Sequence, residues 1–234
     1  MDIESLLDYF QDKDYFEEHS EWIAEHVEKH FPNAEVKVFH EFMALDFKLH
    51  VYFIKPKNLD YAILLTSGMS TLAMNVPEIV EEKEHYEFAE LMLLIPKDIE
   101  FNEVYTGENK NDFIIKMLKA TGKFPHLYDT WLGIGHTIRY SEDLETYGTD
   151  TNFIGGVLLP SVTFDEEFTE ITREGRIISI YSFFPLYESE LNYKIEKGYT
   201  ALLDLIIKNN CSEVLDNNRK DMTPKKSFWS KFKK

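Results

Sequence analysis

Hydrophobic residues recur along this chain at two spacings, one typical of helices and one typical of strands. Apolar residues on one face of a helical repeat predict amphipathic helices at residues 14–31, 112–120 and 188–209. Pro32 directly follows the first helix, and Gly122 and Pro125 follow the second, so we expect both helices to stop there.

Runs that alternate or are continuously apolar predict strands at residues 35–42, 47–54, 61–66, 88–95 and 152–159. A hairpin is expected from 168–172 and 177–184 around a turn at 173–175, and a loop at 68–86. Because successive strands are not separated by helices, a doubly wound parallel sheet is disfavoured. The expected fold class is α/β of the α+β type: a single domain with a mixed, mostly antiparallel sheet and packed helices.

The composition indicates a globular protein with a substantial core. The chain has 234 residues, of which 44% are hydrophobic and 15% aromatic. No run of about 18 apolar residues predicts a membrane span, and the first residues do not show the pattern of a signal peptide. The single cysteine, Cys211, excludes an internal disulfide and a zinc cage of several thiolates. We therefore expect a cytoplasmic protein.

Charge is distributed unevenly. The chain carries −17 overall, but residues 217–234 hold seven basic residues and one acidic residue, which leaves −23 on residues 1–216. A domain with this negative charge repels nucleic acid and attracts a basic protein. The alternative interpretation is that the charge only keeps the protein in solution. We expect one domain at 1–216 and a flexible basic, aromatic tail at 217–234.

The end of the tail, SFWSKFKK (227–234), interleaves aromatic residues with lysines. This composition suits a membrane interface, docking onto the acidic body, or a frayed solubilising end. Because one short turn gives only weak membrane affinity, we favour the latter two and expect no stable membrane insertion.

Motifs for common enzyme chemistry are absent from the sequence. It contains no GxxxxGK[ST] or GxGxxG loop, no HExxH and no GxSxG, and we expect neither cofactor nor metal. His26 and His30 lie four residues apart, a spacing that can bind metal, but Glu25 and Lys29 beside them favour a solvated helix face.

The stretch DTWLGIGHTI (129–138) concentrates unusual residues: Trp131, Gly133, Gly135 and His136. The alternation of Gly133 and Gly135 with apolar residues suits a strand that another backbone or a partner approaches closely. A protein-recognition surface is the second interpretation. The third is a catalytic or metal site formed by His126, Asp129 and His136.

Three blocks resemble suppressor of fused domain proteins: LLTSGMSTLAMNVP (64–77), YEFAELMLLIPKD (86–98) and LKATGKFPHLYDTWLGIGHTI (118–138). The resemblance covers about residues 30–210 and implies one α/β domain that works by binding protein. Animal members of this family sequester Gli-type transcription factors. Gly135 stands where those members carry an acidic residue, and their second domain has no counterpart here, so both departures argue against Gli-type binding.

The stand-alone acidic form looks like the bacterial branch of the family, whose members include immunity proteins for secreted toxins. We therefore expect a non-enzymatic inhibitor that sterically blocks a basic toxin or another protein partner. The alternatives are a small metal-dependent hydrolase that uses His126, Asp129 and His136, and a scaffold protein without a toxin partner. The oligomeric state stays open. The expected binding surface comprises Glu81, Glu82, Glu84, Asp129, Trp131, Gly133, Gly135 and His136.

Overall fold

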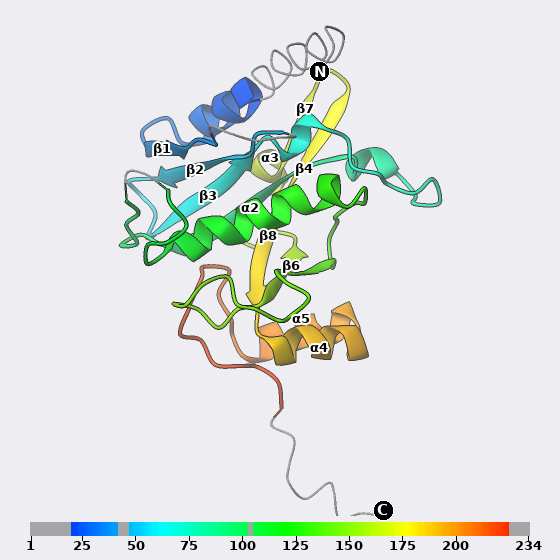
Figure 1. The fold of residues 1–234 in the computed structure, drawn as a ribbon. Coiled ribbons are helices and arrows are strands. Elements are labelled where there is room, and N and C mark those ends of the chain that lie inside the picture. The colour runs from blue at the N-terminus through cyan, green and yellow to red at the C-terminus, as the bar shows by residue number, and fades with distance from the viewer. Residues whose placement is uncertain (1–19, 42–46, 103–104, 225–234) are drawn as a thin grey trace, which may run out of the picture.

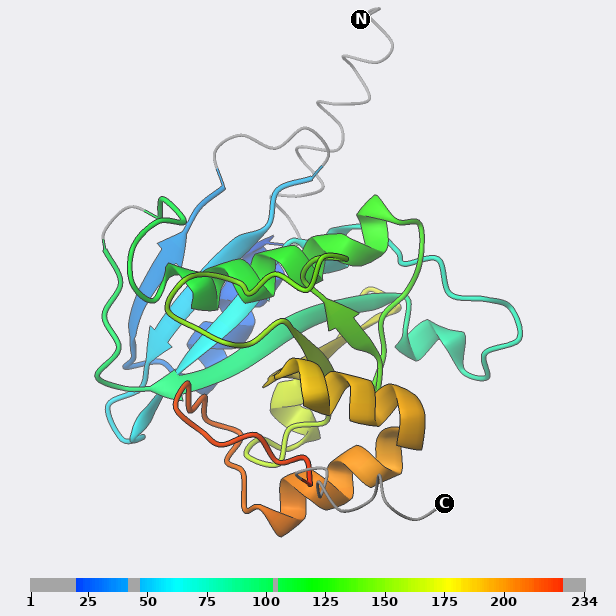
Figure 2. The same ribbon diagram turned by 60° about the horizontal axis from the view of Figure 1, so that its bottom comes forward.

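One mixed sheet organises the protein. The computed structural model describes residues 20–41, 47–102 and 105–224, and within them the strands follow the order β1-β2-β3-β4-β8-β6-β5, with β7 paired to β8 outside this order (Figures 1 and 2). The strands are β1 (Glu35–Phe39), β2 (His50–Lys55), β3 (Tyr61–Ser67), β4 (Phe88–Pro96), β5 (Thr137–Arg139), β6 (Gly155–Leu159), β7 (Glu170–Arg173) and β8 (Arg176–Leu186).

The helices are α2 (Asp112–Leu127), α3 (Glu166–Thr169), α4 (Glu188–Lys197) and α5 (Tyr199–Lys208), with 3-10 turns η1 (Met69–Thr71) and η2 (Lys83–His85). Residues 20–30 are also helical, which confirms the described part of the first predicted helix, while residues 14–19 lie outside the described ranges. No helix in the described ranges is long and apolar enough to cross a membrane.

Pairing in the sheet is antiparallel except between β4 and β8, which run parallel. This confirms the expected mixed, mostly antiparallel sheet in an α+β domain. The predicted strands and the β7–β8 hairpin are present with ends shifted by a few residues, and residues 68–86 form a loop that contains η1 and η2. β4, the most apolar run, lies in the interior of the sheet, as its composition predicts.

Helices cover both faces of the sheet. α2 crosses one face, and the helix at 20–30 and α3 cover the other (Figure 1). Alternate strand residues face opposite layers because side chains point to either side of a strand in turn. Thus Phe53 and Leu64 pack in the α2 layer, whereas their neighbours Tyr52 and Ile63 pack in the layer of the 20–30 helix.

The end of α2 differs from the prediction. The helix continues through Gly122 and Pro125 to Leu127 instead of stopping at residue 120. At Gly122 a Cβ atom would lie 2.8 Å from Leu49 Cδ2, so glycine here allows α2 to approach the sheet closely. Pro125 lies in the last turn, where the hydrogen bond that it cannot donate interrupts little of the helix.

The predicted helix at 188–209 is two helices. Gly198 separates α4 from α5 with φ 90° and ψ 173°, a conformation that favours glycine. The turn folds α5 back, so that both helices pack with the ends of β6 and β8 in a third apolar cluster, which also contains Met222 (Figure 2). A single helix could not have buried both apolar faces on this small area of sheet.

A C-terminal segment, residues 209–222, is fastened to the domain. Leu215 N–H donates to Leu94 O over 2.8 Å at the far end of β4. Arg219 donates to both carboxylate oxygens of Glu190, whose side chain is fully buried, over 2.5 and 2.6 Å. Residues 217–222 of the expected tail thus lie on the domain, and residues 225–234 lie outside the described ranges.

Candidate functional site

The stretch at 129–138 forms a tight loop that leads into β5. Only Thr137–Arg139 is a strand, and Gly135, with φ 82°, donates its N–H to Leu158 O over 2.8 Å. A Cβ atom on Gly135 would lie 3.2 Å from the ring of Tyr199, and one on Gly133 would lie 3.0 Å from Trp131. Both glycines are closely approached, but by side-chain rings rather than by another backbone or a partner, and the strand is shorter than expected.

Aromatic rings fix the shape of this loop. Trp131 packs edge-to-face on Tyr86 with ring centroids 5.5 Å apart, and on His136 at 4.3 Å. Burial lowers the pKa of His136, opposed by a hydrogen bond with the Trp131 backbone. The imidazole is therefore neutral at pH 7 and acts here as a packing ring.

Two residues of the alternative catalytic site, His126 and Asp129, each form a hydrogen bond with a different partner. His126 Nε2 lies 2.9 Å from Met69 O, and Asp129 Oδ1 accepts a 3.1 Å hydrogen bond from Asn75 Nδ2. Burial lowers the pKa of His126, as it does for His136. In the described ranges, no three His, Cys, Asp or Glu side chains come close enough together to hold a metal ion. The geometry thus pairs no base with a nucleophile and assembles no ligand set from these residues.

Of the paired histidines of the first helix, His26 is buried and His30 is half-buried. His26 is 8% exposed, its Nε2 lies 2.9 Å from Phe168 O, and its ring is 4.5 Å from that of His30. Burial lowers the pKa of both histidines. The expectation of a solvated face is wrong for His26, because its ring packs against Phe168 of α3 on this side of the helix.

The loop that contains the predicted Glu81, Glu82 and Glu84 lies against the 129–136 loop. Met74 N–H donates to Glu87 O over 2.7 Å, and Asn75 N–H donates to Thr130 O over 3.1 Å. We call residues 72–87 and 127–136 together the acidic end. It holds six acidic residues and one lysine, Lys83, whose ammonium lies 2.6 Å from Glu78 Oε1 and 3.7 Å from Glu87 Oε1.

Exposed apolar side chains gather on the acidic end, a feature that the sequence pattern did not indicate. Ile79 is 89% exposed and Tyr128 is 69% exposed. Of the nine large hydrophobic residues exposed in the described ranges, five belong to this surface: Leu72, Ile79, Leu127, Tyr128 and Ile134. Exposed apolar patches that are surrounded by charged residues are typical of surfaces that bind other proteins.

Glu90 binds residues 68–70, which lead directly into residues 72–87. We call residues 66–71 with Glu90 the base of the acidic end. The Glu90 carboxylate is fully buried and accepts hydrogen bonds from Gly68 N–H (2.9 Å), Ser70 N–H (3.0 Å), Ser70 Oγ (2.7 Å) and Thr66 Oγ1 (2.5 Å). Burial raises the pKa of this carboxyl, and the hydrogen bonds oppose the rise. The signal available in the sequence was one acidic residue within the apolar run FAELMLLI.

A groove of about 930 Å³ adjoins the acidic end along α2 and the edge strand β5. Leu127, Tyr128 and Thr130 line both surfaces. Its charged lining is mainly basic, from Lys116, Lys119, Lys123 and Arg139, with Glu41 and Glu142 opposing. The groove therefore differs in charge from the surface that it joins.

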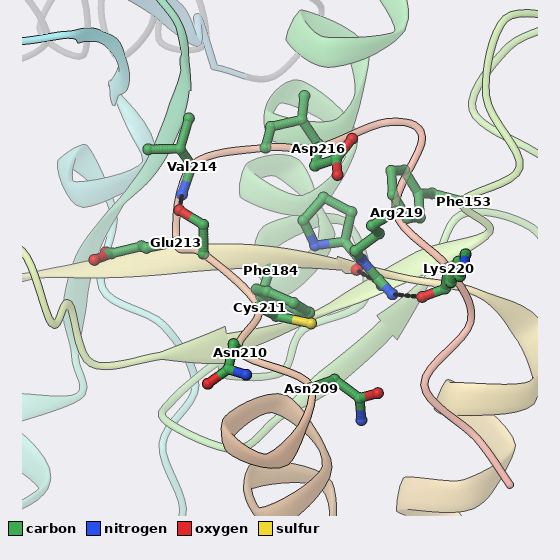
Figure 3. A pocket seen from close by; sticks show the side chains of 13 residues that line it. Phe153, Phe184, Asn209, Asn210, Cys211, Glu213, Val214, Asp216, Arg219 and Lys220 are labelled. Atoms are coloured by element: carbon green, nitrogen blue, oxygen red, sulfur yellow. Dashed lines mark hydrogen bonds between the residues drawn. The ribbon is translucent and has the colours of Figure 1, made fainter.

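A smaller pocket, of about 380 Å³, lies under the C-terminal segment (Figure 3). The Arg219 guanidinium stacks over Phe153 and Phe184 at 5.1 and 5.2 Å, and Figure 3 shows Cys211 on the same wall as Phe184. Burial raises the pKa of the Cys211 thiol, so the nucleophilic thiolate is scarce at neutral pH. This supports a structural role for the cysteine.

The protein is thus an α+β domain whose acidic end combines exposed apolar side chains with an excess of acidic residues. The family model described as suppressor of fused protein (SUFU) matches residues 46–220, and the chain belongs to this family. No curated protein is similar enough in sequence to match.

Solved structures with the same fold include a SUFU homolog from Neisseria gonorrhoeae, at TM-score 0.64 and 11% identity, which covers 89% of this chain and 99% of that one. The Sufu chain of a Sufu–Fu complex has TM-score 0.54 and 11% identity, covering 87% and 92%. Drosophila Suppressor of Fused has TM-score 0.50 and 10% identity, covering 86% of this chain and 50% of its own. At these identities the likeness shows the fold.

Proposed function

We propose that this chain is a non-enzymatic protein-binding domain that holds a basic protein at its acidic end. The observation that carries the proposal is the coincidence of exposed apolar side chains with a local excess of acidic residues. Apolar anchors supply binding free energy when they are desolvated, and surrounding charge supplies orientation and a fast encounter. One solved relative is described as a Sufu–Fu complex, which supports protein binding as the class of function.

The finer proposal is that binding is inhibitory. A partner held at the acidic end would be blocked sterically, as an immunity protein blocks a toxin, and a basic partner suits the charge of −17 on this chain. Support comes from the charge and from the resemblance to stand-alone family members. A partner segment could also continue into the adjoining groove, where the outer edge of β5 offers backbone groups to an added strand.

The test is a charge reversal confined to the acidic end. Glu81, Glu82 and Glu84 are changed together to lysine, and a matched variant changes the exposed Glu28, Glu108 and Glu145, which lie elsewhere on the surface. Each variant has three Glu→Lys substitutions, so the net charge of both rises by the same six units. The two variants and the unmodified chain then capture partners from the lysate and secreted fraction of the native host, at low and at high salt.

We expect the unmodified chain and the matched variant to retain a basic partner that elutes with salt, and the acidic-end variant to lose it. The captured partner is then expressed with and without the chain, and relief of its toxicity tests the inhibitory role. Equal loss in both triple variants would mean that net charge alone attracts the partner. Retention by the acidic-end variant would refute this surface as the binding site.

A further inference from the structure

A pocket of about 610 Å³ lies on the opposite face of the sheet from α2, outside the acidic end. Three segments form it: the end of the 20–30 helix and the turn after it, the β2–β3 turn, and the loop before α3. Pro32, Ala34, Pro56 and Leu59 give part of the lining an apolar character. Because helix, sheet and loop all contribute, the pocket is a fixed feature of the fold.

Aromatic rings form its walls. Phe31 meets Phe164 edge-to-face with centroids 5.9 Å apart and an interplanar angle of 78°. Tyr61 meets the same ring at 6.3 Å and 80°. Phe168 supports Phe164 from behind at 4.5 Å. Phe31 and Tyr61, both set nearly at right angles to Phe164, present π faces in different directions, which is the arrangement that surrounds cationic groups.

A polar atom of one lining residue lacks a partner. His30 lines the pocket, and its Nε2 is buried without a hydrogen bond. Burial lowers the pKa of this imidazole, so it is neutral at pH 7 and Nε2 offers a lone pair when Nδ1 carries the proton. A second buried acceptor without a partner, Glu213 Oε1, belongs to the carboxylate that binds Thr163 Oγ1 over 2.6 Å. Thr163 itself lines the pocket.

We propose that this pocket binds an alkylammonium group, namely the side chain of a lysine presented by a partner protein. The methylene chain would pack on the aromatic walls, and the ammonium would face their π electrons. An apolar guest would gain no electrostatic attraction from the π faces, and an anion would meet the negative faces of the rings. The site is independent of the acidic end.

Charged residues around the pocket determine whether a change at its rim strengthens or weakens the binding of an amine. Asp165 and Glu167 both act on His30 in the direction that favours a cation, whereas Lys29, which lies 3.1 Å from Glu167, acts against it. Lys57 lines the pocket at the exposed rim and would repel an incoming ammonium. Removing the Lys57 charge should therefore strengthen binding of the amine.

The experiment titrates the full chain with Nα-acetyl-lysine N-methylamide and, separately, with the norleucine analogue, which has a hydrogen atom in place of the ammonium. Backbone amide shifts of residues 30, 31, 33 and 34 and of residues 57–61 report binding by NMR at low salt. We expect saturable shifts with the lysine compound and at least fivefold weaker binding of the norleucine compound. Equal affinity for the two compounds, or no saturable shift with the lysine compound, would overturn the proposal.

Two variants and one control refine the measurement. Phe164→Leu and Tyr61→Leu each remove one wall, and we expect at least a threefold loss of affinity in whichever variant keeps the native circular dichroism spectrum. Val162→Ala, at an 87% exposed position next to the pocket, should bind as the unmodified chain does. Lys57→Ala should bind at least twofold more tightly. Weaker binding by Lys57→Ala would contradict a cationic guest.

Discussion

Replacing Glu90 tests the connection between the buried carboxylate and the base of the acidic end. In Glu90→Ala, the N–H groups of Gly68 and Ser70 lose their acceptor inside the protein, while the hydroxyls of Thr66 and Ser70 can rotate toward others. Each buried donor left unsatisfied costs about 1–3 kcal/mol, so the two N–H groups alone cost about 2–6 kcal/mol. A domain is stable by only about 5–15 kcal/mol, so such a loss is easily measured.

Glu90→Gln keeps the shape of the side chain and separates charge from packing. The amide oxygen can still accept hydrogen bonds, but the NH₂ group must face a donor, and we expect a loss of about 1–3 kcal/mol. Urea denaturation followed by circular dichroism gives the free energy of unfolding of each variant. Glu84→Gln, on the exposed surface, serves as the control and should be within about 0.5 kcal/mol of the unmodified chain.

The pH dependence gives the second readout for Glu90. Burial raises the pKa of the folded-state carboxyl above its ordinary value of 4.5. The stability linked to this group is therefore fully present below pH 4.5 and is lost as the pH rises through the folded-state pKa. The glutamine variant has no such titration, so its deficit should be largest near pH 4 and should narrow toward pH 7. A deficit that widens with pH would mean that the hydrogen bonds outweigh desolvation, which would refute the reasoning.

Three further changes test the remaining structural elements. Arg219→Ala leaves the buried Glu190 carboxylate unpaired and should cost about 3–5 kcal/mol in urea denaturation; an unchanged midpoint would contradict the role of Arg219 in fastening the C-terminal segment. Burial lowers the pKa of His50 from 6.5 to about 4, so the stability linked to it is full above pH 6.5 and is lost as the pH falls toward 4; His50→Asn should flatten the pH profile of unfolding in that range. Gly156→Ala places a Cβ atom 2.2 Å from the buried Phe183 ring and should lower Tm by several degrees in calorimetry, which an unaltered Tm would disprove.

Periodicity predicted most of the fold because strand and helix patterns depend on neighbouring residues. Apolar alternation or a continuous apolar run indicated each of the strands β2, β3, β4 and β8. The errors occurred where contacts distant in sequence decide the outcome. α2 passes Gly122 because that glycine faces Leu49, and Gly198 splits a predicted helix because the two halves pack on different parts of one apolar cluster.

The candidate site was predicted only in outline. Glycines and aromatic rings concentrated in 129–138 signalled a special backbone, and the structure assigns them to packing against Tyr86 and Tyr199. The exposure of Ile79 and Tyr128 carries the proposed function, but exposure of an apolar residue has no signature in periodicity. Likewise, the approach of the 72–87 loop to the 129–136 loop depends on hydrogen bonds between residues more than fifty positions apart.

The three blocks that carry the family resemblance are brought together by buried polar contacts. Glu90 of the second block binds Ser70 of the first, and Met69 of the first lies 2.9 Å, through its carbonyl oxygen, from His126 of the third. These contacts build the base of the acidic end. The blocks also contain four of the five exposed apolar residues of that surface, and Ile79 alone of the five lies outside them. Constraints on the base differ from constraints on the surface, because a buried hydrogen bond tolerates little change and an exposed side chain tolerates much. The family likeness therefore constrains the base of the acidic end more than its exposed side chains, and the partner of the proposed binding surface must be identified from the residues displayed on it.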